Sequence, residues 1–77
     1  MIKEHDRIVL TTEVPDVGLK AGDVGTIVHV HTGGEAFEVE FFTLAGKTAA
    51  LATVRADQIR PITPRDLTHA RPMEVSA

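Results

Sequence analysis

The chain contains no cysteine, tryptophan or tyrosine, and Ser76 is its only serine. The absence of cysteine excludes a disulfide framework and a thiolate metal site, and it fits a cytoplasmic protein. It also removes the thiol nucleophile, and the single serine lies at the far end of the chain. The threonines lie in or beside strand-like runs, without an adjacent base to activate them. We therefore expect no enzymatic activity and no cofactor.

Long apolar runs and an excess of positive charge are also missing. No apolar run approaches the roughly 20 residues that a membrane-spanning helix needs, and the first six residues lack the apolar stretch of a secretory signal. The formal net charge is −3, whereas nucleic-acid-binding domains carry a basic stripe. A length of 77 residues predicts one small domain. Composition thus indicates a cytoplasmic protein without membrane contact and disfavours a nucleic-acid partner.

In the first 62 residues, runs of residues typical of β-strands alternate with residues typical of turns. Residues 6–12 are rich in β-branched residues and predict a first strand, with Ile8 and Leu10 on one face and Val9 on the other. The alanine-rich residues 48–54 are predicted as a strand, since they are few and follow a glycine turn. A single 3₁₀-like turn over residues 56–58 then leads to a short closing strand over 59–62.

The long loop over residues 13–25 contains Pro15 and three glycines, which exclude regular structure. Leu19 is expected to anchor this loop to the core. The Gly-Asp-x-Gly at its end lacks the spacing of a phosphate-binding loop, and a strand rather than a helix follows it. Asp23 is instead expected to accept hydrogen bonds from backbone N–H groups of its own loop.

Residues 26–31 and 36–42 form a predicted hairpin around Gly33 and Gly34, because both glycines can adopt the positive φ of a tight turn. Centring the hairpin there gives one apolar and one polar face, which supports the register. The register predicts three buried pairs, Val30 with Phe37, Val28 with Val39 and Thr26 with Phe41. It places Ile27 opposite Glu40 and His29 opposite Glu38 on a mixed, solvated face.

Five strands with one turn before the last predict an all-β fold, a five-stranded SH3-like barrel over residues 1–62. An oligonucleotide-binding barrel is the alternative, but it needs a helix between its third and fourth strands, and no stretch there can form one. Residues 63–77 are expected to be a helical or disordered tail. Thr63 and Pro64 suit the start of a helix running to about His69, and the end from Met73 is expected to be mobile.

A pattern runs through Asp6–Thr11, Pro15, Gly18–Val28 and Gly34–Phe41. Its centre follows Leu-Pro-x-x-Gly-Leu-x-x-Gly-Asp-x-Gly-Thr, with Val14 in place of the first leucine. The pattern resembles a family of small bacterial proteins described only as a domain of unknown function, over about residues 3–62. Some members resemble the small partner of toxin–antitoxin-like gene pairs. The resemblance implies a protein partner and leaves the tail unmatched.

We expect a non-enzymatic protein-binding module, antitoxin-like or accessory to another protein, and monomeric or weakly dimeric through an exposed strand edge near residues 48–54. Phe42 points outward if Phe37 and Phe41 point inward, and it could form an apolar patch with Ile27 and Val9 unless Leu67 or Met73 of the tail covers it. The candidate contact residues come from the first loop, an acidic outer face and this aromatic: Val14, Pro15, Val17, Glu38, Glu40 and Phe42.

Two alternatives stay open. The first loop is also similar to KOW-type modules, which contact RNA or protein there; this alternative requires five cations on one side, Arg7, Lys20, Arg55, Arg60 and Arg65. The second alternative is a metal site on His29 and His31, since residues i and i+2 of a strand project the same way and imidazoles bind zinc. Glu38, with His5 or His69, could complete such a set. Cross-strand pairing of His and Glu on a solvated face explains the same pattern, so no metal is expected.

Overall fold

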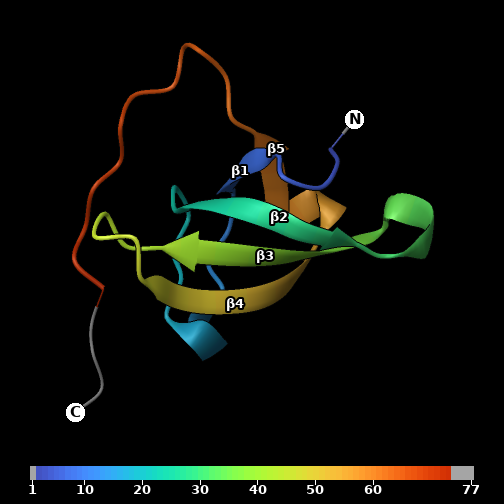
Figure 1. Cartoon of the computed structure of the whole chain (residues 1–77), viewed down its shortest axis with the longest axis horizontal. Helices are drawn as coiled ribbons and strands as arrows, with labels where there is room; N and C mark the ends of the chain where they lie inside the picture. Colours follow the sequence, from blue (N-terminus) through green and yellow to red (C-terminus); the bar gives the residue numbers. More distant parts are fainter. Residues whose placement is uncertain (1, 74–77) are drawn as a thin grey trace.

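The computed structural model describes residues 2–73, which form a five-stranded antiparallel sheet with the order β4-β3-β2-β1-β5 (Figure 1). This confirms the expected all-β class and the five strands. No helix in the described range is long and apolar enough to cross a membrane. The elements are β1 (Arg7–Leu10), η1 (Pro15–Val17), β2 (Val24–Val30), η2 (Thr32–Gly34), β3 (Ala36–Phe42), β4 (Thr48–Arg55), η3 (Ala56–Gln58) and β5 (Ile59–Pro61), where η marks a 3₁₀ turn.

The core lies between the curved strands and is entirely apolar. Ile8, Ile27 and Val39 are 0% exposed, and Leu19 at 2% confirms the expected anchor of the first loop. The other members of the core cluster are Leu10, Phe37, Phe41, Ala52, Val54 and Ile59. Because the chain has no disulfide, burial of these side chains is the main term that stabilises the fold.

β1 departs from the expected alternation of buried and exposed residues. Val9 was assigned to the outer face, yet it is only 7% exposed. Its cross-strand neighbours are Val24 in β2 and Arg60 in β5. Neighbours directly opposite one another on paired strands share a face, so these two side chains shield Val9 from both sides.

A β-bulge corrects the predicted register of the β2–β3 hairpin. Val30 pairs with Phe37 as expected, but the register shifts between Ile27 and His29. Val28 is the extra residue in this bulge, and it is 41% exposed.

The predicted pairs of Val28 with Val39 and of Thr26 with Phe41 are therefore wrong. Ile27 pairs with Val39, and Thr26 pairs with Glu40. The residue assigned to the solvated face, Ile27, is fully buried. Ile27 and Val28 are both β-branched and apolar, so the residue pattern alone does not distinguish which of them faces the core.

The two edges of the sheet differ in length and composition. β4 has eight residues, with no proline and a single charge at Arg55. β5 has three residues and ends in Pro61, which has no N–H to donate to another strand. The β4 edge is thus the longer and less protected of the two.

Of the two forms expected for the tail, helical or disordered, the helical one is not observed up to residue 73. The Asp66 N–H donates to the Thr63 carbonyl at 3.1 Å, which closes a single turn, and residues 67–73 have no regular structure. The Asp66 carboxylate accepts hydrogen bonds from Thr63 and from Arg60, so its bonds hold the turn against β5 rather than continuing a helix. The expectation of a mobile end falls mostly on residues 74–77, which lie outside the described residues.

Candidate functional site

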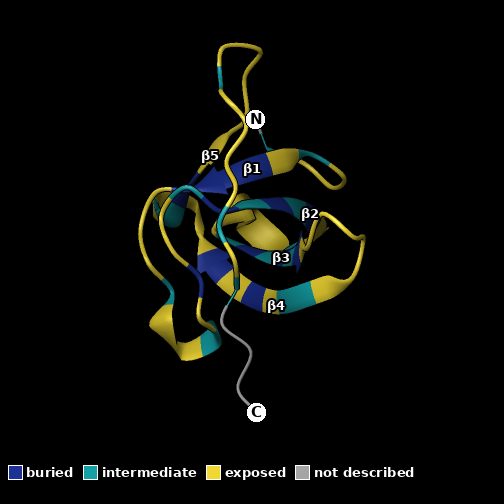
Figure 2. Cartoon of the chain, turned by 90° about the vertical axis from the view of Figure 1, so that its left-hand side faces the viewer, coloured by how far each residue is buried: buried dark blue, intermediate teal, exposed yellow. Residues whose placement is uncertain are grey.

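The tail forms a strap, residues 66–73, that runs down the side of the molecule where β3 ends and β4 begins (Figure 1). Turned to face that side, the strap passes in front of the strands from the β5 end toward β4 (Figure 2). A groove of about 780 Å³ lies between the strap and the sheet. Its apolar lining includes Leu19 and Phe41 from the core and Met73 from the strap. The strap therefore bridges an apolar groove without filling it.

Exposed apolar side chains concentrate around this groove. Six large apolar side chains of the described residues are exposed, and four of them line the groove: Phe42, Leu44, Ile62 and Leu67. The two that do not line it are Val28 and Leu51. Single exposed apolar residues are ordinary, whereas a contiguous group of them marks an interaction site.

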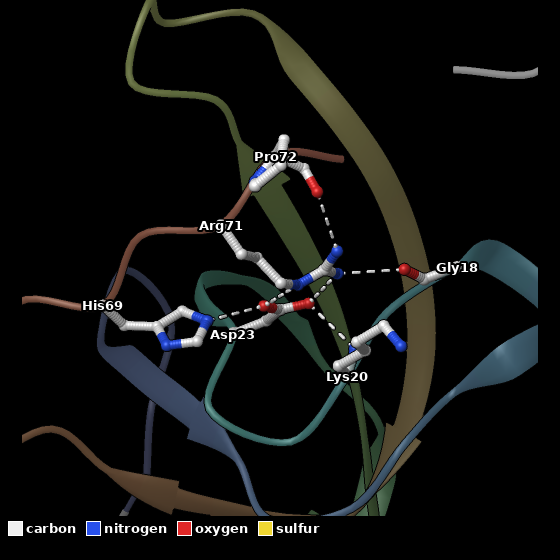
Figure 3. Close-up of polar contacts among 6 residues, drawn as sticks. All are labelled: Gly18, Lys20, Asp23, His69, Arg71 and Pro72. Carbon is white, nitrogen blue, oxygen red and sulfur yellow. Dashed lines mark hydrogen bonds and ion pairs between the residues drawn. The ribbon is translucent and has the colours of Figure 1, made fainter. Parts of the chain in front are cut away.

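Asp23 fastens the strap to the first loop (Figure 3). Arg71 donates from Nε to Asp23 Oδ1 at 2.8 Å and from Nη2 to Oδ2 at 2.5 Å. Arg71 Nη2 also donates to the Gly18 carbonyl at 3.0 Å, and His69 Nε2 lies 3.1 Å from Asp23 Oδ1. Asp23 is the only polar or charged residue that is buried between residues 2 and 73. A bidentate guanidinium–carboxylate ion pair of this kind is among the strongest side-chain contacts.

The backbone sets the position of Asp23. Its carbonyl accepts from the Leu10 N–H at 2.9 Å, and the Gly22 N–H donates to the Leu10 carbonyl at 2.8 Å. The Lys20 N–H donates to Asp23 Oδ2 at 2.8 Å, which confirms the expected backbone cap. β1 thus holds the backbone of Asp23, and the Lys20 N–H of the same loop orients its carboxylate.

A second ion pair holds the opposite end of the strap. Arg60 donates from Nη2 to Asp66 Oδ1 at 2.7 Å and from Nη1 to Oδ2 at 3.0 Å. The hydrogen bond from Arg60, together with those from Thr63, lowers the pKa of the Asp66 carboxyl far below its ordinary value. Between the two ion pairs, Leu67–Ala70 are exposed. The strap is therefore fixed at its ends and open in its middle.

A family model described as a domain of unknown function, DUF4926, matches residues 4–61. The chain belongs to this family. The matched residues include all five strands of the DUF4926 domain, whereas the strap lies beyond them. No curated protein and no solved structure matches the chain.

Phe42 of the DUF4926 domain points outward as expected and is 47% exposed. The expected patch with Ile27 and Val9 is wrong, because both of these side chains are buried. The groove replaces them with other apolar neighbours, Leu44 and Leu67 among them. Leu67 and Met73 of the strap line the same groove as Phe42, but Phe42 stays 47% exposed, so the tail does not cover it as one of the two expectations had it.

The acidic outer face of β3 is occupied by contacts within the domain. Glu38 accepts from Thr53 Oγ1 at 2.8 Å and lies 2.6 Å from His31 Nε2. The contacts with His31 and then Thr53 lower the pKa of the Glu38 carboxyl. Glu40 accepts from Thr48 Oγ1 at 2.5 Å. Both carboxylates therefore already have partners, and neither lines the groove.

The three candidate residues of the first loop lie apart from the groove. Val14 and Val17 pack against the core, and Pro15 between them is exposed. None of the three lines the groove. Their apolar surface serves mainly to seal the core beneath η1.

The histidines of β2 lie close together without a complete metal-binding set. The His29 and His31 rings are 5.0 Å apart, edge to face. His31 contacts Glu38, whereas His29 lies 4.0 Å from Glu4. The described residues contain no group of three or more His, Asp or Glu side chains placed to hold a metal ion. His69, a candidate third ligand, contacts Asp23 instead.

The cations required for nucleic-acid binding are partly neutralised. Arg60 pairs with Asp66, and Arg55 Nε donates to Asp57 Oδ1 at 3.1 Å. Each of these cations is thus matched by an adjacent carboxylate, which reduces the positive field that phosphates would meet.

The sequence missed the link between the first loop and the tail. Asp23 is separated from His69 by 46 residues and from Arg71 by 48. A pair so distant leaves no periodic signal. One local signal was present: Asp23 lies between Leu19, the expected anchor of the loop, and Val24, the first residue of β2. A carboxylate buried at such a position requires a partner such as a cation.

Asp23 makes the stability of this domain dependent on pH. Burial alone would raise the pKa of its carboxyl, but hydrogen bonds from Arg71, from the Lys20 backbone and from His69 outweigh that effect and hold the pKa below its ordinary value of 3.8. A carboxyl with a lowered pKa stabilises the fold above its unfolded-state value, and that stabilisation is lost as the pH falls through the folded-state value.

We expect Asp23→Asn to lower the free energy of unfolding by about 1–3 kcal/mol at pH 7, since a hydrogen-bonded charge is lost and the amide can still accept from Lys20. The difference from the wild type should shrink below pH 4. Urea unfolding of both proteins between pH 7 and pH 2.5 measures it. A difference that stayed constant over this range would show that the carboxylate charge contributes nothing.

Proposed function

We propose that this domain is a non-enzymatic protein-binding module that uses the groove and its rim as its binding surface. The observation that carries the proposal is the concentration of four of the six exposed large apolar side chains around one groove. Burying a leucine or phenylalanine side chain against a partner contributes about 1.5–3 kcal/mol. Phe42, Leu44 and Leu67 together therefore offer enough apolar surface for specific association.

The resemblance to small members of bacterial two-gene arrangements supports a narrower proposal. In this proposal the partner is the second protein of such a pair, and the domain acts as its antitoxin-like or accessory subunit. The acidic net charge of −3 favours a basic partner, since complementary charge speeds association.

The groove supports this function better than the acidic face of β3 does. Glu38 and Glu40 are already hydrogen-bonded within the domain, so a partner would have to replace those bonds. Leu44 and Leu67 are 91% and 93% exposed, so a partner can contact their side chains without breaking a hydrogen bond that those side chains make. Removing these exposed apolar side chains from water on contact with a partner favours association.

Affinity capture from the cells that encode the protein tests the proposal. We expect a stoichiometric protein partner with the wild type, and at least about a tenfold loss with Leu44→Ser/Leu67→Ser, since each 1.4 kcal/mol is a factor of ten. The control Val28→Ser/Leu51→Ser removes two exposed apolar side chains that do not line the groove, and it should retain the partner. Equal loss in both variants, or no loss in either, would exclude the groove as the binding surface.

A further inference from the structure

We propose that Asp23 is the anchor for an arginine of the partner protein, and that the strap occupies this anchor as an internal substitute for the partner's binding segment. The proposal rests on the protein-binding function above and adds the chemistry of the partner. The partner segment is extended and carries an arginine followed, two residues later, by an apolar side chain.

The first argument is the burial of the Asp23 carboxylate. Its side chain is 11% exposed and that of Arg71 is 20% exposed. When the strap moves away, the Lys20 N–H is the contact that the loop still supplies to the carboxylate. A buried carboxylate without a cation is strongly disfavoured. Whatever displaces the strap is therefore required to bring a positive charge to this position.

The second argument is the geometry of the donors, which selects arginine over lysine. Arg71 reaches both carboxylate oxygens and, from Nη2, the Gly18 carbonyl (Figure 3). These three acceptors lie around one planar guanidinium, whose N–H groups have a fixed fork geometry. A lysine ammonium is a single point of charge and does not reproduce this arrangement.

The third argument concerns the apolar residue. Met73 is half-buried and packs against the core, and its methyl carbon lies 3.4 Å from the position that a Cβ on Gly18 would occupy. Residues i and i+2 of an extended chain project to the same side. Arg71 and Met73 thus insert together beside Gly18, and a partner segment with the same spacing fits the same two positions.

The fourth argument is that side chains alone hold residues 67–73 of the strap against the sheet. Among the described residues, no backbone–backbone hydrogen bond joins residues 67–73 to the strands, and the strap is held there by the side chains of His69, Arg71 and Met73. As part of the same chain, however, it acts at an effective concentration on the order of millimolar. The strap therefore weakens the partner's apparent affinity without blocking the site permanently.

A synthetic peptide with the sequence of residues 66–73, capped at both ends and carrying a fluorophore, is the probe for this anchor. The proteins are the full-length wild type and Arg71→Ala, and the readout is fluorescence anisotropy. We expect Arg71→Ala to bind the peptide saturably and at least about tenfold more tightly than the wild type does, because its own strap no longer occupies Asp23. A peptide with citrulline at the arginine position has the same shape without the charge, and it should bind Arg71→Ala at least about tenfold more weakly.

Two further measurements keep the test decisive. Arg71→Ala leaves a buried carboxylate unpaired, so its fold is checked by amide NMR. If it does not fold, Met73→Ala replaces it, since this change loosens the strap while Asp23 stays paired, and it should bind the arginine peptide more tightly than the wild type does. Asp23→Asn should remove peptide binding in either background.

Three results would overturn the proposal. Equal binding of the arginine and citrulline peptides would show that charge is not recognised, and equal binding by the wild type and the loosened variants would show that the strap does not compete. If the wild type is a dimer and the Asp23→Asn variant is a monomer, the strap of a second copy, and not a partner protein, binds at Asp23. If the partner is nevertheless captured through Leu44 and Leu67, the binding function stands and only the arginine anchor fails.

Discussion

Replacing Ile27 by alanine is expected to lower the free energy of unfolding by about 2–5 kcal/mol, because the removed atoms come from a side chain that is 0% exposed at the centre of the core. A chain of 77 residues at 0.05–0.15 kcal/mol per residue has a total stability of roughly 4–12 kcal/mol. The substitution therefore removes a large share of that stability and can leave the domain partly unfolded at 37 °C.

The neighbouring Val28→Ala is the matched control for this prediction. Val28 is the extra residue of the β2 bulge and is 41% exposed, so its truncation should change stability by about 0.5 kcal/mol or less. Urea unfolding followed by circular dichroism measures both variants. If Val28→Ala were the more destabilising change, Val28 rather than Ile27 would face the core and the bulge would be misplaced.

Gly25→Ala is expected to destabilise the domain by about 1–3 kcal/mol or more, since added atoms in a filled core force their neighbours to move. A Cβ at this position would lie 2.5 Å from Val39 Cγ1 and 2.8 Å from the nearest ring carbon of Phe41. Both neighbours are buried side chains of β3. The glycine is required here for space, because its φ is not among the positive values of the chain.

A double-mutant cycle with Val39→Ala tests the steric origin of this effect. Removing the Val39 methyl groups makes room for the new Cβ, so the two changes together should cost less than their sum, with a coupling energy of about 0.5–3 kcal/mol. Gly34→Ala is the control, because nothing lies within 4 Å of its Cβ position and only its φ of +69° opposes the change. Purely additive effects of Gly25→Ala and Val39→Ala would contradict the close approach of β2 and β3.

Residues with a local signal were assigned correctly from the sequence. The hairpin turn was predicted at Gly33 and Gly34, and both residues have positive φ. Leu19 was predicted to anchor the first loop and is buried, and Asp23 was predicted to accept a backbone hydrogen bond and does so. The bulge at Val28 had no such signal, because two adjacent β-branched residues satisfy either phase of an alternating strand.

Within the candidate site, the sequence predicted only features that depend on a single residue and its neighbours in the chain. The outward direction of Phe42 follows from its neighbour Phe41, and the structure confirms it. The apolar neighbours of Phe42 were not predicted, because they come from the β3–β4 turn and from the tail, which only the folded chain brings together. The same holds for the pair of Asp23 and Arg71, whose 48-residue separation hides it from any short pattern.

The difference in length between the two sheet edges determines how many further strands the sheet of this domain can pair with. A strand can add along the eight residues of β4, whereas the three residues of β5 end in Pro61 and terminate the ladder. A molecule with one adhesive edge pairs with a copy of itself through a twofold axis and then has no edge left to offer. If copies of the domain associate through the sheet, we expect the assembly to stop at a closed dimer, because growth into a fibril requires a second edge of comparable length on each molecule.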